Sequence, residues 1–362
     1  MSRLHIRKAV ATLPAYVPGA RPAGPDTAKL SSNELPYPAQ EGVVEAIRRA
    51  AGGVNRYPQM TGEDLVAALA ARHGVGAGDV VVGNGSVALI QHVLDAVCDE
   101  GDDVVLPWRS FEAYPICVAV AGARAVRVPL TADGRHDVPA MLAAVTPRTR
   151  AVLVCTPNNP TGLAVTERQI RAFLEKVPAD IPVVIDEAYF EFCAASTVPE
   201  SEEAPLNGMD IYRDYENVII LRTFSKAQGL AGLRVGYSIS HPQITQHLRV
   251  AATPFAVTAL AEAAAIASIE HEDTVMERVS HLVAERERVT ARLRELGYDF
   301  PSTYANFVWL PLGERTGEFV QLMYEHALSV RAFGTEGVRV SIGEVEANDR
   351  FLSLCEVFAK GL

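Results

Sequence analysis

Residues 183–189 read Val-Val-Ile-Asp-Glu-Ala-Tyr, an apolar run that ends in an acid. An uninterrupted β-branched run is typical of a strand buried on both faces, which occurs mainly in parallel sheets covered by helices. In such sheets ligands collect beyond the carboxyl ends of the strands, where Asp186 would lie. The stretch therefore predicts an α/β core and a candidate site. A helix N-cap is the alternative interpretation of Asp186.

Six similar apolar runs surround this stretch, and they predict strands at 80–82, 104–106, 125–128, 151–155, 218–221 and 235–239. Helical patterns separate the runs, so we expect a largely parallel seven-stranded sheet flanked by helices. After residue 241 an Ala-, Glu- and Arg-rich helical region at about 258–296 leads to short strands at 307–310 and 338–342. This change predicts a smaller α+β lobe, joined to the first by a long helix.

The predicted organisation has three parts. A Pro- and Gly-rich arm at 1–40 would extend along the small domain, residues 41–245 would form the large domain, and residues 246–362 would form the small domain. The apolar stretch 251–269 contains Pro254 and Glu262, so it is interpreted as a buried helix, and we expect no membrane contact.

Composition restricts the partners and the compartment. The 33 Lys and Arg residues against 44 Asp and Glu residues give a formal net charge of −11, which argues against nucleic acid. The 5 cysteines are an odd number without a CxxC pair, which favours free thiols in the cytoplasm. No histidine or second carboxylate stands at metal-ligand spacing from Asp186, so no metal is expected.

The predicted strand at 80–82 runs into Gly83-Asn84-Gly85-Ser86 and then a helical pattern. Glycines let the backbone approach an anion, and a helix start offers free N–H groups. The segment also matches a relaxed dinucleotide fingerprint, which keeps a nucleotide-dependent dehydrogenase as an alternative. A tight turn without a ligand is the third interpretation.

Only five lysines occur in the chain: Lys8, Lys29, Lys176, Lys226 and Lys360. Lys226 alone follows a predicted core strand, within Thr223-Phe224-Ser225-Lys226, and Arg234 comes eight residues later. This pattern suits a phosphorylated aldehyde, because the amine forms a Schiff base while the hydroxyls and the arginine hold phosphate. A solvated surface lysine is the alternative, and a dehydrogenase would leave this lysine without a role.

Together these segments resemble the fold-type I pyridoxal-phosphate aminotransferases over essentially the whole chain. Within them the chain is similar to the histidinol-phosphate aminotransferase branch, and most of all to actinobacterial aromatic amino acid (phenylalanine) aminotransferases. The resemblance rests on ordered motifs at 30–34, 55–58, 83–86, 108–114, 157–162, 186–189, 223–227, 234, 305–307 and 338–341.

The resemblance implies a role for each matched residue. Lys226 would bind the cofactor covalently and move the substrate proton, and Asp186 would pair with the protonated ring nitrogen. Asn159 and Tyr189 would hydrogen-bond the ring's phenolic oxygen, and Phe111 would stack on the ring. A Pro-flanked turn is the alternative interpretation of Asn159.

The phosphate of the cofactor would be held by backbone amides and by polar side chains from two loops. These are the amides of Gly85, Ser86 and Val87 and the side chains of Thr223, Ser225 and Arg234. Tyr57 would reach the phosphate in a neighbouring subunit, which implies a homodimer with shared active sites, although Tyr57 could also be a packed surface aromatic.

The expected substrates are an amino acid and a 2-oxo acid such as 2-oxoglutarate. Arg339 would form a bidentate pair with the α-carboxylate near Asn159, and a solvent-facing strand position is its alternative. Tyr16 is a candidate for an apolar side-chain pocket, whereas Arg331 is a candidate for the phosphate of histidinol phosphate. The segment 108–112, Trp-Arg-Ser-Phe-Glu, resembles the aromatic branch, so aromatic substrates are favoured.

Overall fold

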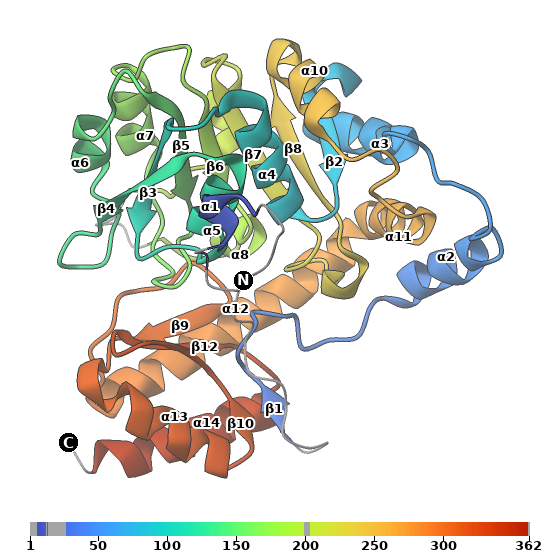
Figure 1. The fold of residues 1–362 in the computed structure, drawn as a ribbon. Helices are drawn as coiled ribbons and strands as arrows, with labels where there is room; N and C mark the ends of the chain where they lie inside the picture. The colour runs from blue at the N-terminus through green and yellow to red at the C-terminus, as the bar shows by residue number, and fades with distance from the viewer. Residues whose placement is uncertain (1–5, 12, 14–26, 199–202, 361–362) are drawn as a thin grey trace.

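The computed structural model describes residues 6–11, 13, 27–198 and 203–360, which form two lobes (Figure 1). The larger lobe contains a seven-stranded sheet. In spatial order its strands are β2 (Val80–Gly83), β8 (Gly236–Ser240), β7 (Val218–Thr223), β6 (Val183–Asp186), β5 (Thr149–Cys155), β3 (Asp103–Trp108) and β4 (Arg124–Pro129). Of these seven strands, only β8 runs in the opposite direction to the others, so its pairings with β2 and β7 are antiparallel. The predicted mostly parallel sheet is therefore confirmed.

Successive residues of the central strands enter two different cores, as the alternation of side chains along a strand requires. Val104 packs on one face of β3 and Val105 on the other. The first face is covered by α4 (Ser86–Val97), α5 (Ala113–Ala121) and α10 (Pro242–Ala251). The second face is covered by α2 (Glu41–Ala51), α3 (Glu63–His73), α6 (Val138–Ala143), α7 (Glu167–Leu174), α9 (Gly208–Tyr212) and α11 (Ala259–Glu270).

The smaller lobe has its own core and an antiparallel sheet in the order β11 (Arg331–Phe333), β12 (Gly337–Ser341), β9 (Phe307–Leu310). Its helices are α12 (Glu272–Glu295), α13 (Thr316–Glu325) and α14 (Val345–Ala359), and α8 (Phe190–Ala194) of the large lobe packs on α12. The smaller α+β unit predicted from the sequence is therefore present.

The C-terminal part of the arm joins the small lobe, whereas its first described residues pack on α5 of the large lobe, where Arg7 donates to the backbone oxygen of Val120 at 2.9 Å. Strand β1 (Ala28–Lys29) pairs in parallel with β10 (Leu328–Ser329), and Leu30 is buried in the small-lobe core. Nearer the N-terminus the arm also forms one helical turn, α1 (Lys8–Ala11), which the proline-rich composition did not predict.

The predicted helical region at 258–296 is two helices, because the chain turns at His271 between α11 and α12. Alanines of α11 such as Ala264 pack into the large-lobe core, whereas α12 enters the small-lobe core from Val275 onward. On this packing we propose a domain boundary near His271, in place of the predicted boundary after residue 245. Within the described residues, no helix is long and apolar enough to cross a lipid bilayer.

A buried ion pair links the carboxyl ends of β6 and β7. Arg222 donates from Nε and Nη2 to Oε2 of Glu187 at 3.0 and 2.8 Å, and both side chains are at most 5% exposed. The other oxygen of Glu187 accepts a hydrogen bond from the amide of Gly208 at 2.6 Å. Because Glu187 directly follows Asp186, this pair fixes the strand end that carries the candidate acid.

We expect Arg222→Met to lower the free energy of unfolding by about 3–5 kcal/mol, because it leaves the Glu187 carboxylate buried without its counter-charge. Urea unfolding followed by circular dichroism measures the change. Combining it with Glu187→Gln should recover most of the loss, since the charge is then absent. Removal of the exposed Arg48 side chain, which lies 3.7 Å from Glu45, should cost less than about 1 kcal/mol. Equal losses in the single and double variants would contradict this account.

Candidate active site

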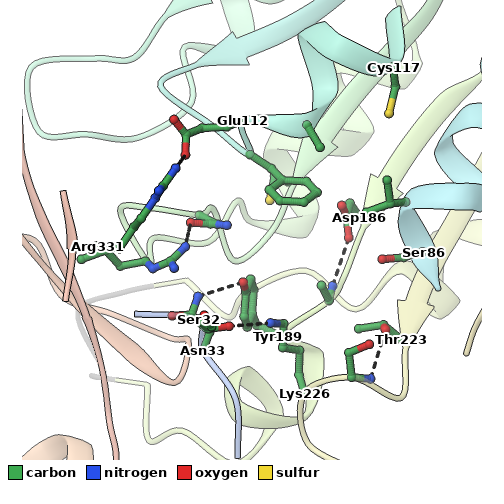
Figure 2. Close-up of a pocket in the computed structure, with 18 of the residues that line it drawn as sticks. Ser32, Asn33, Ser86, Glu112, Cys117, Asp186, Tyr189, Thr223, Lys226 and Arg331 are labelled. Atoms are coloured by element: carbon green, nitrogen blue, oxygen red, sulfur yellow. Dashed lines mark hydrogen bonds and ion pairs between the residues drawn. The ribbon is translucent and has the colours of Figure 1, made fainter. Parts of the chain in front are cut away.

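A cavity of about 420 Å³ lies between the large sheet, the small lobe and the arm. It opens at the carboxyl ends of the parallel strands, where ligands collect in such sheets. Its lining includes most of the predicted site residues, namely Ser86, Val87, Phe111, Asn159, Asp186, Tyr189, Thr223, Ser225, Lys226, Arg234, Arg331 and Arg339. Figure 2 shows Asp186, Ser86, Thr223 and Lys226 on one side of this cavity, opposite Glu112 and Arg331.

One end of the cavity is a cradle for an anion. Gly85 precedes α4 with a φ of +81°, and a Cβ atom there would lie 2.5 Å from Nη2 of Arg234. The missing side chain therefore lets the guanidinium lie against the start of the helix. Nη1 of Arg234 donates to Oγ of Ser225 at 3.3 Å, and Thr223 lines the same end. Helix-start amides, hydroxyls and an arginine are the donors that phosphate requires.

Asp186 lies at the end of β6 and is 4% exposed. Its Oδ2 accepts a hydrogen bond from the Tyr114 hydroxyl at 2.7 Å, and its Oδ1 accepts one from the amide of Ala188 at 3.2 Å. Burial raises the pKa of this carboxyl to about 6, although both hydrogen bonds favour its ionised form. Since each carboxylate oxygen has two lone pairs, Asp186 can also accept a hydrogen bond from a ligand in the cavity.

Lys226 follows β7, and its Nζ donates to the backbone oxygen of Ser32 at 3.2 Å. Burial, together with the nearby charge of Arg339, lowers the pKa of this amine to about 7. A substantial fraction of the amine is therefore neutral near pH 7, and a neutral amine is the form that attacks a carbonyl.

Arg339 and Tyr189 connect the cavity to the small lobe and the arm. Arg339 donates from Nη1 to Oδ1 of Asn159 at 2.6 Å and from Nη2 to the backbone oxygen of Ser31 at 2.7 Å. Tyr189 accepts a hydrogen bond from Nδ2 of Asn33 at 3.0 Å, and burial raises the pKa of its hydroxyl. Arg339 is thus buried at the cavity, and its strand position does not face solvent.

Three predicted site residues are not among those that line this cavity. Gly85 lies directly before Ser86 and against Arg234, both of which line it. Tyr16 lies outside the described residues. Tyr57 is 85% exposed, stacks on Phe255 with ring centroids 5.0 Å apart, and does not line the cavity of its own chain. Its role toward a neighbouring subunit stays a prediction.

Among the residues that the sequence analysis missed, Ser32, Asn33, Glu112 and Tyr114 each contact a predicted site residue. All four lie in the motif segments 30–34 and 108–114, so their position in an ordered motif was the available signal. Their partners are distant in the chain, since 72 residues separate Tyr114 from Asp186 and 194 separate Ser32 from Lys226.

The donor set fits a phosphorylated aromatic aldehyde. The cradle takes the phosphate, Lys226 can attack the aldehyde, and Asp186 can hold a protonated ring nitrogen. Phe111, set edge-on to Tyr114 with centroids 5.5 Å apart, offers an aromatic wall. Across the described ranges, no group of three or more His, Cys, Asp or Glu side chains could hold a metal ion.

Comparison with known proteins agrees with this geometry. The sequence model of aminotransferase class I and II matches residues 25–353. The chain is 49% identical over 359 residues to the aromatic amino acid aminotransferase of Streptomyces avermitilis, covering 99% of this chain and 98% of that protein. It is 48% identical over 358 residues to the protein of the same name from Thermobifida fusca, with 98% of each chain covered.

Among solved structures, the chain is similar to histidinol-phosphate aminotransferase from Sinorhizobium meliloti, determined in complex with pyridoxal-5'-phosphate. The TM-score is 0.87 at 28% identity, and the match covers 100% of this chain and 98% of that one.

We expect Asp186→Asn to stabilise the cofactor-free chain by about 1–3 kcal/mol at pH 8, because it removes a buried charge and keeps the side-chain shape. The pKa of Asp186 in the folded chain, about 6, lies above its ordinary value, so the free energy of unfolding of the unaltered chain falls as the pH rises toward 6. The difference in free energy of unfolding in favour of Asp186→Asn should therefore grow between about pH 4 and 6 and then stay constant.

Urea unfolding of both proteins at several pH values measures this difference. The exposed Asp180→Asn is the matched control, and it should leave stability within about 0.5 kcal/mol at every pH. A difference between Asp186→Asn and the unaltered chain that does not vary with pH would contradict the prediction.

Proposed function

Because this chain belongs to the class I and II aminotransferase family, we propose that it is a pyridoxal-phosphate-dependent aromatic amino acid aminotransferase. It moves the amino group between an aromatic amino acid and a 2-oxo acid such as 2-oxoglutarate. The observation that carries the proposal is that the buried Asp186 and the partly buried Lys226 line one cavity, beside a group of donors that suits an anion. A nucleotide-dependent dehydrogenase leaves both residues, and Arg339, without a role.

When bound, pyridoxal phosphate supplies an aldehyde that condenses with amines and a ring that withdraws electrons from the substrate Cα. The cradle formed by Ser86, Thr223, Ser225 and Arg234 would hold the phosphate. Asp186 would accept a hydrogen bond from the protonated ring nitrogen and keep it protonated, since an ionised carboxylate without water nearby favours an adjacent positive charge.

Lys226 binds the cofactor and afterwards carries the proton. Its depressed pKa of about 7 means that Nζ can accept a proton from the substrate Cα and return it near neutral pH. Nζ lies 5.7 Å from the centre of the Tyr189 ring, so the aromatic face stabilises the amine when it is charged. The Tyr189 hydroxyl and Asn159, which line the same cavity, would orient the ring oxygen of the cofactor.

Arg339 takes the α-carboxylate of the substrate. Its planar guanidinium can form two parallel hydrogen bonds with a carboxylate, which fixes the direction of the Cα–H bond. Its present contacts with Asn159 and Ser31 hold the guanidinium in one orientation before substrate arrives.

Two observations support an aromatic substrate over histidinol phosphate. The relatives that are 45–49% identical over at least 97% of this chain include several named aromatic amino acid aminotransferase, whereas the histidinol-phosphate aminotransferase structure is 28% identical. The cavity also contains Phe111, Ile116 and Phe333, which offer apolar surface to a ring.

We further propose that the enzyme acts as a homodimer in the cytoplasm. Several large apolar side chains near Tyr57 are exposed, with values of 64% for Val54, 57% for Met60 and 40% for Phe255. Such a group of exposed apolar residues is typical of an interface. All five cysteines are free, which suits a reducing compartment.

We expect the purified holoenzyme to transaminate phenylalanine with 2-oxoglutarate, with kcat/KM at least about tenfold above that for histidinol phosphate. Lys226→Ala should lose at least about 10³-fold in rate, because it removes both the covalent anchor and the proton carrier. Borohydride treatment of the unaltered protein should fix the cofactor on Lys226, as detected by peptide mass spectrometry.

The exposed Lys360→Ala is the matched control and should keep full activity. Native-rate turnover by Lys226→Ala would exclude the assigned mechanism. A large preference for histidinol phosphate would instead favour the alternative substrate within the same family.

Sedimentation of the holoenzyme should give about twice the chain mass of 39.0 kDa. Tyr57→Ala should weaken binding of pyridoxal phosphate by at least about tenfold, because a hydrogen bond to a charged group contributes about 1.5–3 kcal/mol. Since Tyr57 does not line its own cavity, this loss can arise only through a second copy. Val357→Ala, at a position 59% exposed, should have no effect. A monomeric enzyme with full activity would refute shared active sites.

A further inference from the structure

Two arginines stand side by side at the substrate end of the cavity. Arg331 on β11 lies directly opposite Arg339 on β12 in the antiparallel register. Residues paired in this way have Cβ atoms about 5 Å apart, and like charges at such positions repel each other. Both arginines line the cavity, so on their own they would attract a substrate with two anionic groups.

Glu112 neutralises the charge of Arg331. It comes from the opposite lobe, at the start of α5, and its Oε2 accepts a hydrogen bond from Nη2 of Arg331 at 2.6 Å (Figure 2). The two side chains are 29% and 13% exposed, so solvent only partly screens the pair. The Glu112 side chain makes no capping bond to its own helix.

A second, similar pair lies beside the first. Arg109 is ion-paired with Glu336 and lies 4.0 Å from Glu112. Neither Arg109 nor Glu336 lines the cavity as described. The charges of Arg109 and Arg331 are therefore balanced by those of Glu112 and Glu336. Of these two carboxylates, only that of Glu112 lines the cavity.

We propose that Glu112 is a specificity-determining residue that selects substrates with an uncharged side chain and rejects phosphomonoesters. The inference rests on the proposed aminotransferase function. An uncharged ring leaves the Glu112–Arg331 pair intact. Histidinol phosphate carries its phosphate ester in place of an α-carboxylate, so this group would meet Arg339 and, across the strand pair, Arg331. A phosphate brings a charge of about −1.5 to −2, larger than that of a carboxylate, and at this position it would either lie beside the Glu112 carboxylate or displace it from Arg331. Selection therefore depends more on repulsion between the phosphate and the Glu112 carboxylate than on new contacts with the preferred substrate.

The same charge balance ranks a third class of substrate. A 2-oxo acid with a distal carboxylate brings one negative charge, which can replace that of Glu112 at Arg331. The reduction in kcat/KM that Glu112 causes for such an acid should therefore lie between the reductions for an uncharged ring and for a phosphate.

The test compares single-turnover donor half-reactions of the holoenzyme with phenylalanine and with histidinol phosphate, so that the acceptor plays no part. Glu112→Gln keeps the shape and removes the charge. We expect the ratio of kcat/KM for histidinol phosphate to that for phenylalanine to rise at least about tenfold, mainly through KM. Binding of phenyl phosphate, a competitor that does not react, should tighten by a similar factor.

Two variants provide controls. Glu336→Gln removes the same charge from the neighbouring pair outside the cavity and should leave the ratio within about twofold. Glu112→Asp keeps the charge and should keep the preference for phenylalanine. If Glu112→Gln fails to bind the cofactor, Glu112→Ala provides the same measurement.

An unchanged ratio and unchanged phenyl phosphate binding in a Glu112→Gln holoenzyme would overturn the inference while leaving the proposed function intact. Absence of turnover of either donor by the unaltered holoenzyme would instead contradict the proposed function. An equal rise in the ratio for Glu336→Gln would assign the effect to overall charge and overturn the specific role of Glu112.

Discussion

The site depends on removing one amine and one carboxylate from water within the same cavity. Burial lowers the pKa of Lys226 to about 7 and raises that of Asp186 to about 6, so both groups titrate close to neutral pH. Neither shift would exist on a solvated surface, because desolvation is the first cause of each. A buried amine that can lose and regain a proton, facing an acid that can hold a cation, is the combination that transamination needs.

Enclosure by two lobes and the arm produces that desolvation. The large sheet supplies Asp186 and the loop with Lys226, the small lobe supplies Arg339, and the arm lies between them. Ser32 accepts from Lys226 while Asn33 holds both Tyr189 and, through its Oδ1, the Ser341 hydroxyl at 2.8 Å. The arm therefore acts as a wall of the cavity, and it carries hydrogen bonds that would otherwise need water.

Much of this arrangement was predictable from local patterns. The apolar runs located all seven strands of the large sheet to within a few residues, because most of these strands are buried on both faces and are therefore largely apolar. The turn at His271 was not predictable, since alanine-rich and charged helical patterns continue across it. Glu112 and Tyr114 gave no local signal of their partners, because Arg331 and Asp186 meet them only across 219 and 72 residues.

The sequence by itself determined the sheet, the family and the identity of the reactive groups, because strand periodicity and the order of short motifs are properties of neighbouring residues. Only the tertiary structure decided how the pKa values of Asp186 and Lys226 shift and which carboxylate pairs with Arg331. Arg331 looked like a phosphate site in the sequence, yet Glu112 from the other lobe neutralises it at 2.6 Å. Charge balance depends on distance and burial in space, and neither is written along the chain.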